Sequence, residues 1–238
     1  MSRNHDAIVV LTGAGISAES GLKTFRDNDG LWEDHPVEEV VTPAAFVRDP
    51  KLVHRFYNAR RAQLGDPALQ PNAAHTALAK FGRQWPGSFN IITQNVDNLH
   101  ERAGSTNVIH MHGELLKIRC QQSGVISTHS SDISVDTECD CCGTRGNLRP
   151  NIVWFGEVPM QMELIETLLA SSTLFVSIGT SGTVYPAAGF LQMAQVYGAK
   201  TVELNLEPSE SASRFDDARY GPASQIVPDF FAELSEQN

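Results

Sequence analysis

Short apolar runs and longer amphipathic segments alternate along this chain. We expect strands at residues 7–11, 89–93, 108–112, 173–178, 201–206 and 225–227. The most apolar of these, 7–11 and 173–178, have the composition of strands buried on both faces of a sheet. Between the strands, apolar residues recur at helical spacing, as in the stripe Leu52, Val53, Phe56, Ala59 and Leu64. This alternation predicts an α/β fold with a doubly wound parallel sheet.

A glycine-rich turn follows the first strand. Gly13, Gly15 and Ala18 have the G-x-G-x-x-A spacing. In that spacing the glycines permit a sharp turn and close approach to a pyrophosphate, and the small third residue lets a helix pack tightly. Alone, the spacing is equally typical of a turn that binds nothing. A long polar loop then carries Phe25 and Arg26, which could cover a nicotinamide ring and pair with phosphate, or could simply pack in the core and pair on the surface.

Composition narrows the class of protein. The 238 residues suit one large domain or one domain with an insertion, and 41% hydrophobic residues are enough for a real core. The net charge of −10 argues against binding nucleic acid directly. No apolar run approaches the ~20 residues of a membrane span, and the five apolar residues before Thr12 are too few for a signal peptide. We therefore expect a cytoplasmic location and no membrane partner.

Polar and small residues gather after the predicted strands. In parallel sheets ligands bind at the carboxyl ends of the strands, so these residues are candidates for binding ribose, carboxamide and phosphate groups. They are Gln94, Asn95 and Asp97 after the second strand, Gly179, Thr180 and Ser181 after the fourth, and Asn205 and Glu207 after the fifth. An ordinary polar turn that caps a helix would have a similar composition.

Two histidines, His110 and His112, end the third strand. In an extended strand both point the same way, so their spacing does not select one of them. A His-x-His pair could bind metal, whereas a single histidine could act as a general base, because its pKa lies near neutrality.

All four cysteines lie between residues 120 and 142. Clustered thiols in a chain without a secretion signal are more typical of metal ligands than of disulfides. Cys139 and Cys142 have zinc-ligand spacing, and Cys120 provides a third thiolate, which predicts a structural zinc site. The fourth ligand could be Cys141, Ser123 or water. The alternative that no metal binds also stays open.

The segment GAGISAESGLKTFR at residues 13–26 resembles the cofactor loop of the sirtuins, the NAD-dependent protein lysine deacylases. Residues 93–97, 110–113, 179–181 and 205–207 are similar to further motifs of that family, in the same order, and together they cover nearly the whole chain. The family usually has a second cysteine where this chain has Ser123. The resemblance implies that NAD is consumed as a co-substrate, and that nicotinamide and 2′-O-acyl-ADP-ribose are formed.

The resemblance also assigns roles to residues. His112, which directly precedes a glycine, would be the catalytic base, and Asn95 would share the catalytic site. Val153 and Phe155 would bind the substrate peptide and line the acyl-lysine tunnel. The residues expected to bind NAD are Gly13, Ala14, Gly15, Glu19, Phe25, Arg26, Trp32, Gln94, Asn95, Asp97, Gly179, Thr180, Ser181, Asn205, Glu207 and Ala223.

Tyr57 and Arg60 lie three residues apart on a predicted helix and therefore share a face. A phenol and a planar guanidinium together suit a carboxylate, although spacing alone favours an ordinary helix surface. The pair resembles the Tyr-x-x-Arg of class III sirtuins, whose acyl pocket accepts succinyl and malonyl groups. The resemblance thus implies that both acetyl-lysine and succinyl-type acyl-lysine are substrates.

We predict a Rossmann-like NAD-binding domain from residues 1–30, 87–117 and 149–238. A smaller domain would comprise the helical insertion 31–86 and the cysteine module 118–148. We expect the protein to be a monomer. Alternatives are an NAD-dependent protein ADP-ribosyltransferase, a non-catalytic regulator that binds NAD or ADP-ribose, and an NAD(P)H dehydrogenase, which shares only the first glycine-rich turn.

Overall fold

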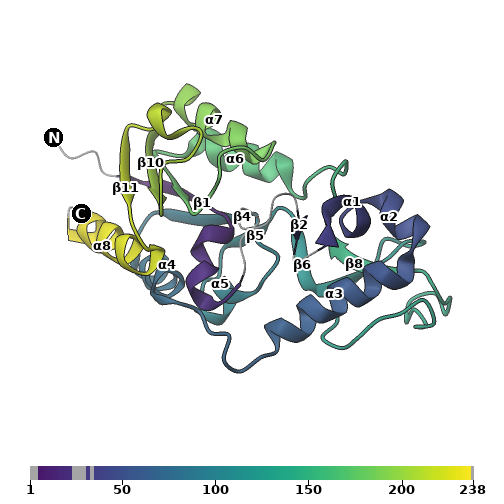
Figure 1. Cartoon of the computed structure of the whole chain (residues 1–238). Coiled ribbons are helices and arrows are strands. Elements are labelled where there is room, and N and C mark those ends of the chain that lie inside the picture. Colours follow the sequence, from purple (N-terminus) through teal and green to yellow (C-terminus); the bar gives the residue numbers. More distant parts are fainter. Residues whose placement is uncertain (1–4, 23–30, 33–34, 237–238) are drawn as a thin grey trace.

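A six-stranded parallel sheet forms the larger part of the molecule in the computed structural model, which describes residues 5–22, 31–32 and 35–236 (Figure 1). Its strands, in spatial order, are β11 (Asp217–Tyr220), β10 (Lys200–Asn205), β9 (Leu174–Ile178), β1 (Ala7–Thr12), β4 (Ser88–Thr93) and β5 (Val108–His110). Thr12 pairs with Thr93 on one side and with Ile178 on the other. The carboxyl ends of the central strands are therefore level with one another.

Helices cover both faces of this sheet, because its buried strands are apolar on both sides. Helices α4 (Ala73–Gln84) and α8 (Ala223–Glu236) pack on one face in a cluster that includes Ile8, Val10 and Val176. Helices α6 (Met162–Ser171) and α7 (Phe190–Val196) pack on the other face with Val9 and Leu11. The alternation along β1 thus supplies two cores, and the predicted doubly wound α/β fold is confirmed.

A smaller part lies beside the sheet (Figure 1). It contains the antiparallel strands β6 (Gly113–Cys120), β7 (Ile126–Thr128) and β8 (Leu148–Ile152), and the two-stranded pair β2 (Leu31–Trp32) and β3 (His35–Pro36). Helices α1 (Val37–Val40), α2 (Pro43–Arg48) and α3 (Pro50–Leu64) pack on β6 and β8 through a third core, which includes Phe46, Tyr57 and Trp154. Thr42 and Asp49 cap α2 and α3, each directly before a proline at the first helical position.

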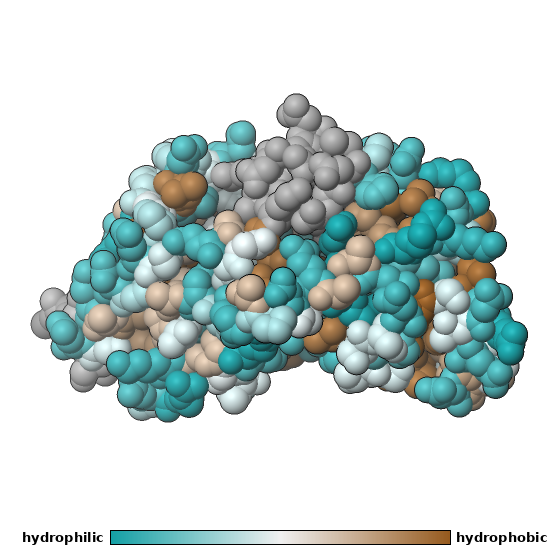
Figure 2. All heavy atoms as spheres, turned by 60° about the horizontal axis from the view of Figure 1, so that its bottom comes forward, coloured by the Kyte–Doolittle hydropathy of each residue, from teal (hydrophilic) through white to brown (hydrophobic). Residues whose placement is uncertain are grey.

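Short elements complete the chain at the edges of the sheet. They are α5 (Leu99–Arg102) and the 3-10 turns Ala14–Ile16, Ala18–Ser20, Ala187–Gly189 and Ala212–Arg214. None of the helices in the described ranges is long and apolar enough to cross a membrane. The face in Figure 2 is mostly polar, with apolar side chains in small separate groups.

The strand predicted at residues 225–227 is wrong, because these residues lie in helix α8. Val227, Phe230, Phe231 and Leu234 are all buried at helical spacing, and this stripe packs against the sheet and α4. The last strand is β11, immediately before Gly221. Helix α4, which the predicted domain boundaries assign to the smaller domain, also packs in the sheet's core cluster.

Candidate active site

The carboxyl ends of β1 and β9 meet at three glycines, Gly13, Gly15 and Gly179. Gly13 N–H donates to Ile178 O, and Gly15 N–H donates to Gly179 O, both at 3.0 Å. A Cβ on Gly15 would lie 2.7 Å from Gly179 Cα, and one on Gly13 would lie 2.7 Å from Gly179 O. The two backbones are in contact, so only glycine fits at these positions. Because no side chain stands there, a ligand can approach the backbone at this edge of the sheet.

Four further predicted binding residues follow β9 and β10. Asn205 Nδ2 donates to Thr180 O at 2.8 Å, so the ends of the two strands are joined by a side chain. Ser181 Oγ lies 2.8 Å from Thr183 Oγ1. Glu207 is exposed to solvent. The structure brings Asn205, Thr180 and Ser181 to the same edge of the sheet as the glycines.

Glu19 and Ala223 lie side by side although 204 positions separate them in the sequence. The carboxylate of Glu19 accepts hydrogen bonds from Ser224 N at 2.9 Å and from Ser224 Oγ at 2.5 Å. Ala223 is the first residue of α8. This contact ties the cofactor loop to the first turn of α8 and holds Ala223 next to it.

The loop after β4 is held by a buried network. Asn95 Nδ2 donates to Gly13 O at 3.1 Å and to Ser17 Oγ at 3.2 Å. Ser17 Oγ in turn donates to Asp97 Oδ2 at 3.1 Å, and Leu99 N donates to Asp97 Oδ1 at 3.0 Å. Burial raises the pKa of Asp97, and the hydrogen bonds from Leu99 and Ser17 oppose that rise. Ser17, which sequence reasoning missed, thus joins the two predicted NAD-binding loops.

His112 lies just beyond β5, next to Gln94. Its Nδ1 is 3.1 Å from Gln94 O. Because a carbonyl oxygen only accepts, Nδ1 carries the hydrogen, and the lone pair of a neutral imidazole is then on Nε2. Burial lowers the pKa of His112, and the bond to Gln94 opposes this. The side chain is therefore neutral at pH 7 and has the protonation state of a general base.

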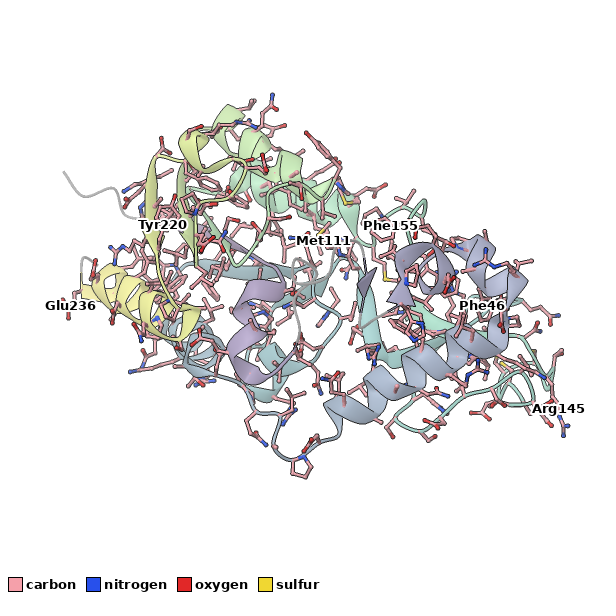
Figure 3. The ribbon with its side chains drawn as sticks, in the orientation of Figure 1. Phe46, Met111, Arg145, Phe155, Tyr220 and Glu236 are labelled. Atoms are coloured by element: carbon pink, nitrogen blue, oxygen red, sulfur yellow. The ribbon has the colours of Figure 1, made fainter. Side chains whose placement is uncertain are left out.

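The segment from Val153 to Glu157 lies at the junction of the two parts, where Figure 3 labels Phe155. Phe155 is half exposed, at 50%. Val153 N–H donates to His112 O, and Phe155 N–H donates to Val41 O. Glu157 accepts from Trp154 N and from both terminal nitrogens of Arg149, whose guanidinium stacks on the Trp154 ring at 3.4 Å. A peptide strand added here would therefore bond through the carbonyl oxygens of this rigid turn.

Tyr57 and Arg60 lie on one face of α3, and Tyr57 is fully buried. Trp154 Nε1 donates to Tyr57 Oη at 2.8 Å. Burial raises the pKa of Tyr57, so the phenol keeps its hydrogen. Arg60 stacks on Phe56 at 4.7 Å, and its buried Nε and Nη1 have no hydrogen-bond partner in the described part of the chain. Trp154 is a second residue that sequence reasoning missed, although it lies between the two predicted peptide-binding positions.

Four thiols converge at the end of β6. The Sγ atoms of Cys120, Cys139, Cys141 and Cys142 all lie within 4.8 Å of one another. Cys120 and Cys142 are 3.8 Å apart, which matches the ~3.8 Å between two ligands of a tetrahedral zinc ion with Zn–S bonds of about 2.3 Å. Cys141 joins the three predicted ligands, and Ser123 Oγ lies 3.1 Å from its Sγ. The cluster is consistent with a structural zinc site that has a full set of thiolates.

Three predicted cofactor contacts cannot be placed. Phe25 and Arg26 lie outside the described residues, and so does the side chain of Trp32, whose backbone forms part of β2. Ala14 follows Gly13 in the first 3-10 turn. The remaining predicted residues are distributed between the edge of the sheet and the junction with the smaller part.

Comparison with known proteins shows which protein family has this arrangement. The Sir2 family model matches residues 13–186. An NAD-dependent protein deacylase of Pasteurella multocida (strain Pm70) is 60% identical over 227 residues, which cover 95% of this chain and 97% of the relative. The crystal structure of a Sir2 homolog–NAD complex has a TM-score of 0.88 and 35% identity, covering 98% of this chain and 91% of that one. A structure of Sir2 bound to acetylated peptide has a TM-score of 0.81 and 28% identity, covering 98% and 94%.

The chain therefore belongs to the Sir2 family. Its activity is NAD-dependent protein deacylation. NAD is the co-substrate of that reaction, and the cysteine cluster is consistent with structural zinc.

Proposed function

We propose that this deacylase removes dicarboxylic acyl groups such as succinyl from lysine, in addition to acetyl. The observation that carries the proposal is Arg60, whose buried Nε and Nη1 lack a hydrogen-bond partner among the described residues. Buried donor nitrogens without a partner are costly unless a ligand satisfies them. A carboxylate fits the planar fork, and the neighbouring Tyr57 hydroxyl adds a donor on the same helix face.

The neighbouring Arg61 shows what a structural arginine looks like in the same helix. Its Nε donates to Leu115 O, and its Nη1 donates to Asn58 Oδ1 and Ser131 O. Arg61 thereby joins α3 to β6 and to the cysteine module. Within the described ranges the Nε and Nη1 of Arg60 make no comparable bonds, which supports a role in binding a substrate carboxylate.

The residues at the edge of the sheet suit distinct tasks in the reaction. The glycines at residues 13, 15 and 179 let the NAD phosphates approach the backbone, and the loop that carries Asn95 and Asp97 would lie against the nicotinamide ribose. The acyl oxygen attacks the anomeric carbon as nicotinamide leaves. Nε2 of His112 then accepts the proton of a ribose hydroxyl, which attacks the former acyl carbon. Water completes the release of lysine and 2′-O-acyl-ADP-ribose.

The substrate is an acylated lysine in an extended peptide, held by the backbone of Val153 and Phe155. The acetylated peptide in the related Sir2 structure supports this assignment. We also propose that the protein acts as a monomer in the cytoplasm, where the four thiols stay reduced for metal binding.

Arg60→Met tests the acyl range, because methionine keeps the bulk of the side chain and removes its charge. We expect kcat/KM for a succinyl-lysine peptide to fall about 100-fold, since hydrogen bonds to a charged group contribute roughly 1.5–3 kcal/mol. Deacetylation of the matched acetyl-lysine peptide should stay within about threefold. Arg55→Met, the same change at an exposed position of α3, is the control and should alter neither rate. Equal loss of both activities in Arg60→Met would refute the pocket assignment.

A further inference from the structure

His110, the histidine that the family resemblance leaves without a role, contacts the catalytic loop. The side chain ends β5 and is 7% exposed. Its Nδ1 is 3.2 Å from Asn95 O, and its Nε2 is 2.8 Å from Glu101 Oε1 on α5. The Nδ1 of His112 contacts the preceding carbonyl, that of Gln94. Two imidazoles thus hold two consecutive carbonyl oxygens of the loop after β4.

The two contacts of His110 require two N–H groups. A backbone carbonyl and a carboxylate can only accept, so each ring nitrogen of His110 must donate. Only the imidazolium has a hydrogen on both nitrogens. In either neutral tautomer, one ring lone pair would face an oxygen lone pair, of Asn95 or of Glu101, and that contact would open.

The charges around His110 favour the imidazolium. Burial by itself lowers the pKa of His110, but the hydrogen bond and charge of Glu101, together with the charge of Glu114, raise it above the ordinary value. The other titratable or charged groups near it are His100 on α5, Asp97 in the loop, and Lys117 on β6, which pairs with Glu114 at 2.6 Å. Burial by itself raises the pKa of Glu101, but the hydrogen bond and charge of His110 lower it below the ordinary value.

Asn95 is also restrained through its main-chain and side-chain nitrogens. Its N–H donates to Thr93 Oγ1 at 3.0 Å, and its side-chain amide nitrogen donates to Gly13 O and Ser17 Oγ. The carbonyl held by His110 is the remaining main-chain anchor. Release of that carbonyl would free the Asn95–Val96 peptide, which directly follows the Gln94 carbonyl that sets the tautomer of His112.

We propose that His110 is a positioning residue for deacylation, kept doubly protonated by Glu101 so that it fixes the main chain of Asn95 and, through Gln94, the imidazole of His112. The proposal predicts an alkaline limb in kcat that belongs to His110. Activity is full while the imidazolium holds both oxygens. It falls as the pH rises through the elevated pKa of His110.

The test is the pH dependence of kcat for an acetyl-lysine peptide at saturating NAD, in wild type and three variants. His110→Phe keeps the ring size without donors, so kcat should fall about tenfold below the pKa of His110, as expected for a lost charged hydrogen bond, and the difference from wild type should narrow above it. His110→Gln keeps a donor that does not titrate, so it should recover most of the rate and lack the alkaline limb. Glu101→Gln should also lack the limb, because a glutamine amide can donate to the Nε2 of a neutral imidazole.

Glu166→Gln, at an exposed position on α6, is the control and should keep the wild-type profile. A wild-type kcat without an alkaline limb, or a limb that persists unchanged in Glu101→Gln, overturns the proposal. A His110→Phe rate within twofold of wild type below the pKa of His110 overturns it as well. If His110→Phe does not fold, Glu101→Gln still decides, because Glu101 is a partly exposed surface side chain, 42% accessible.

Discussion

Replacement of Gly179 by alanine should be far more damaging than its single added methyl group suggests. Gly179 has φ +63°, and a Cβ there would lie 2.5 Å from Ile16 N and 2.7 Å from Gly15 C. The left-handed conformation costs an alanine roughly 1–2 kcal/mol. The clash with two backbones that cannot move independently adds about 1–3 kcal/mol. The expected loss of stability is therefore about 2–5 kcal/mol.

Gly198 provides a matched control, because it has φ +86° but nothing within 4 Å of an added Cβ. Gly198→Ala should carry the conformational cost alone. At roughly 2–4 °C per kcal/mol for a chain of this size, Gly179→Ala should lower Tm by about 4–20 °C and Gly198→Ala by about 2–8 °C. Circular dichroism melts measure this difference, and calorimetric titration should show weaker NAD binding for Gly179→Ala only. Equal Tm shifts in the two variants would refute the close packing of the cofactor loop on β9.

Three further predictions concern other sites. Trp154→Phe removes the hydrogen bond to Tyr57, so KM for a succinyl-lysine peptide should rise about tenfold. KM for the acetyl-lysine peptide should stay within twofold, and equal changes in the two KM values would contradict the orienting role of the indole. Burial lowers the pKa values of His54 and His75 to about 4, below the unfolded ~6.5, so their stabilising contribution is complete above pH 6.5 and shrinks as the pH falls toward 4. Urea titrations should show a loss of about 2 kcal/mol per histidine at pH 5, and a smaller total loss in His54→Phe. Cys141→Ser should weaken zinc retention against a chelator, measured as metal content, whereas Ser123→Ala should not; the opposite result would make Ser123 the ligand.

The local patterns of the sequence determined the sheet and the cofactor loop. Apolar strands buried on both faces, such as Ala7–Thr12, give a nearly context-independent signal, and the glycines after them have no side chain that tertiary packing could redirect. Helical spacing was less decisive at the C-terminus. There, the three-residue segment 225–227 predicted a strand, and the longer stripe through Leu234 forms the helix instead. The order of motifs and their likeness to the sirtuins were likewise readable from the sequence alone.

The tertiary structure decided which side chains share a site, because contacts between residues far apart depend on how the elements pack. Only packing brings the Trp154 indole to Tyr57, 97 positions away, and buries two Arg60 donors where no described residue accepts from them. Only packing brings Cys141 within reach of the other three thiols and sets His110 between a carbonyl and a carboxylate. Sequence spacing fixes distances along one helix or strand, whereas hydrogen-bond partners and buried charges arise between elements, where the sequence carries no local signal.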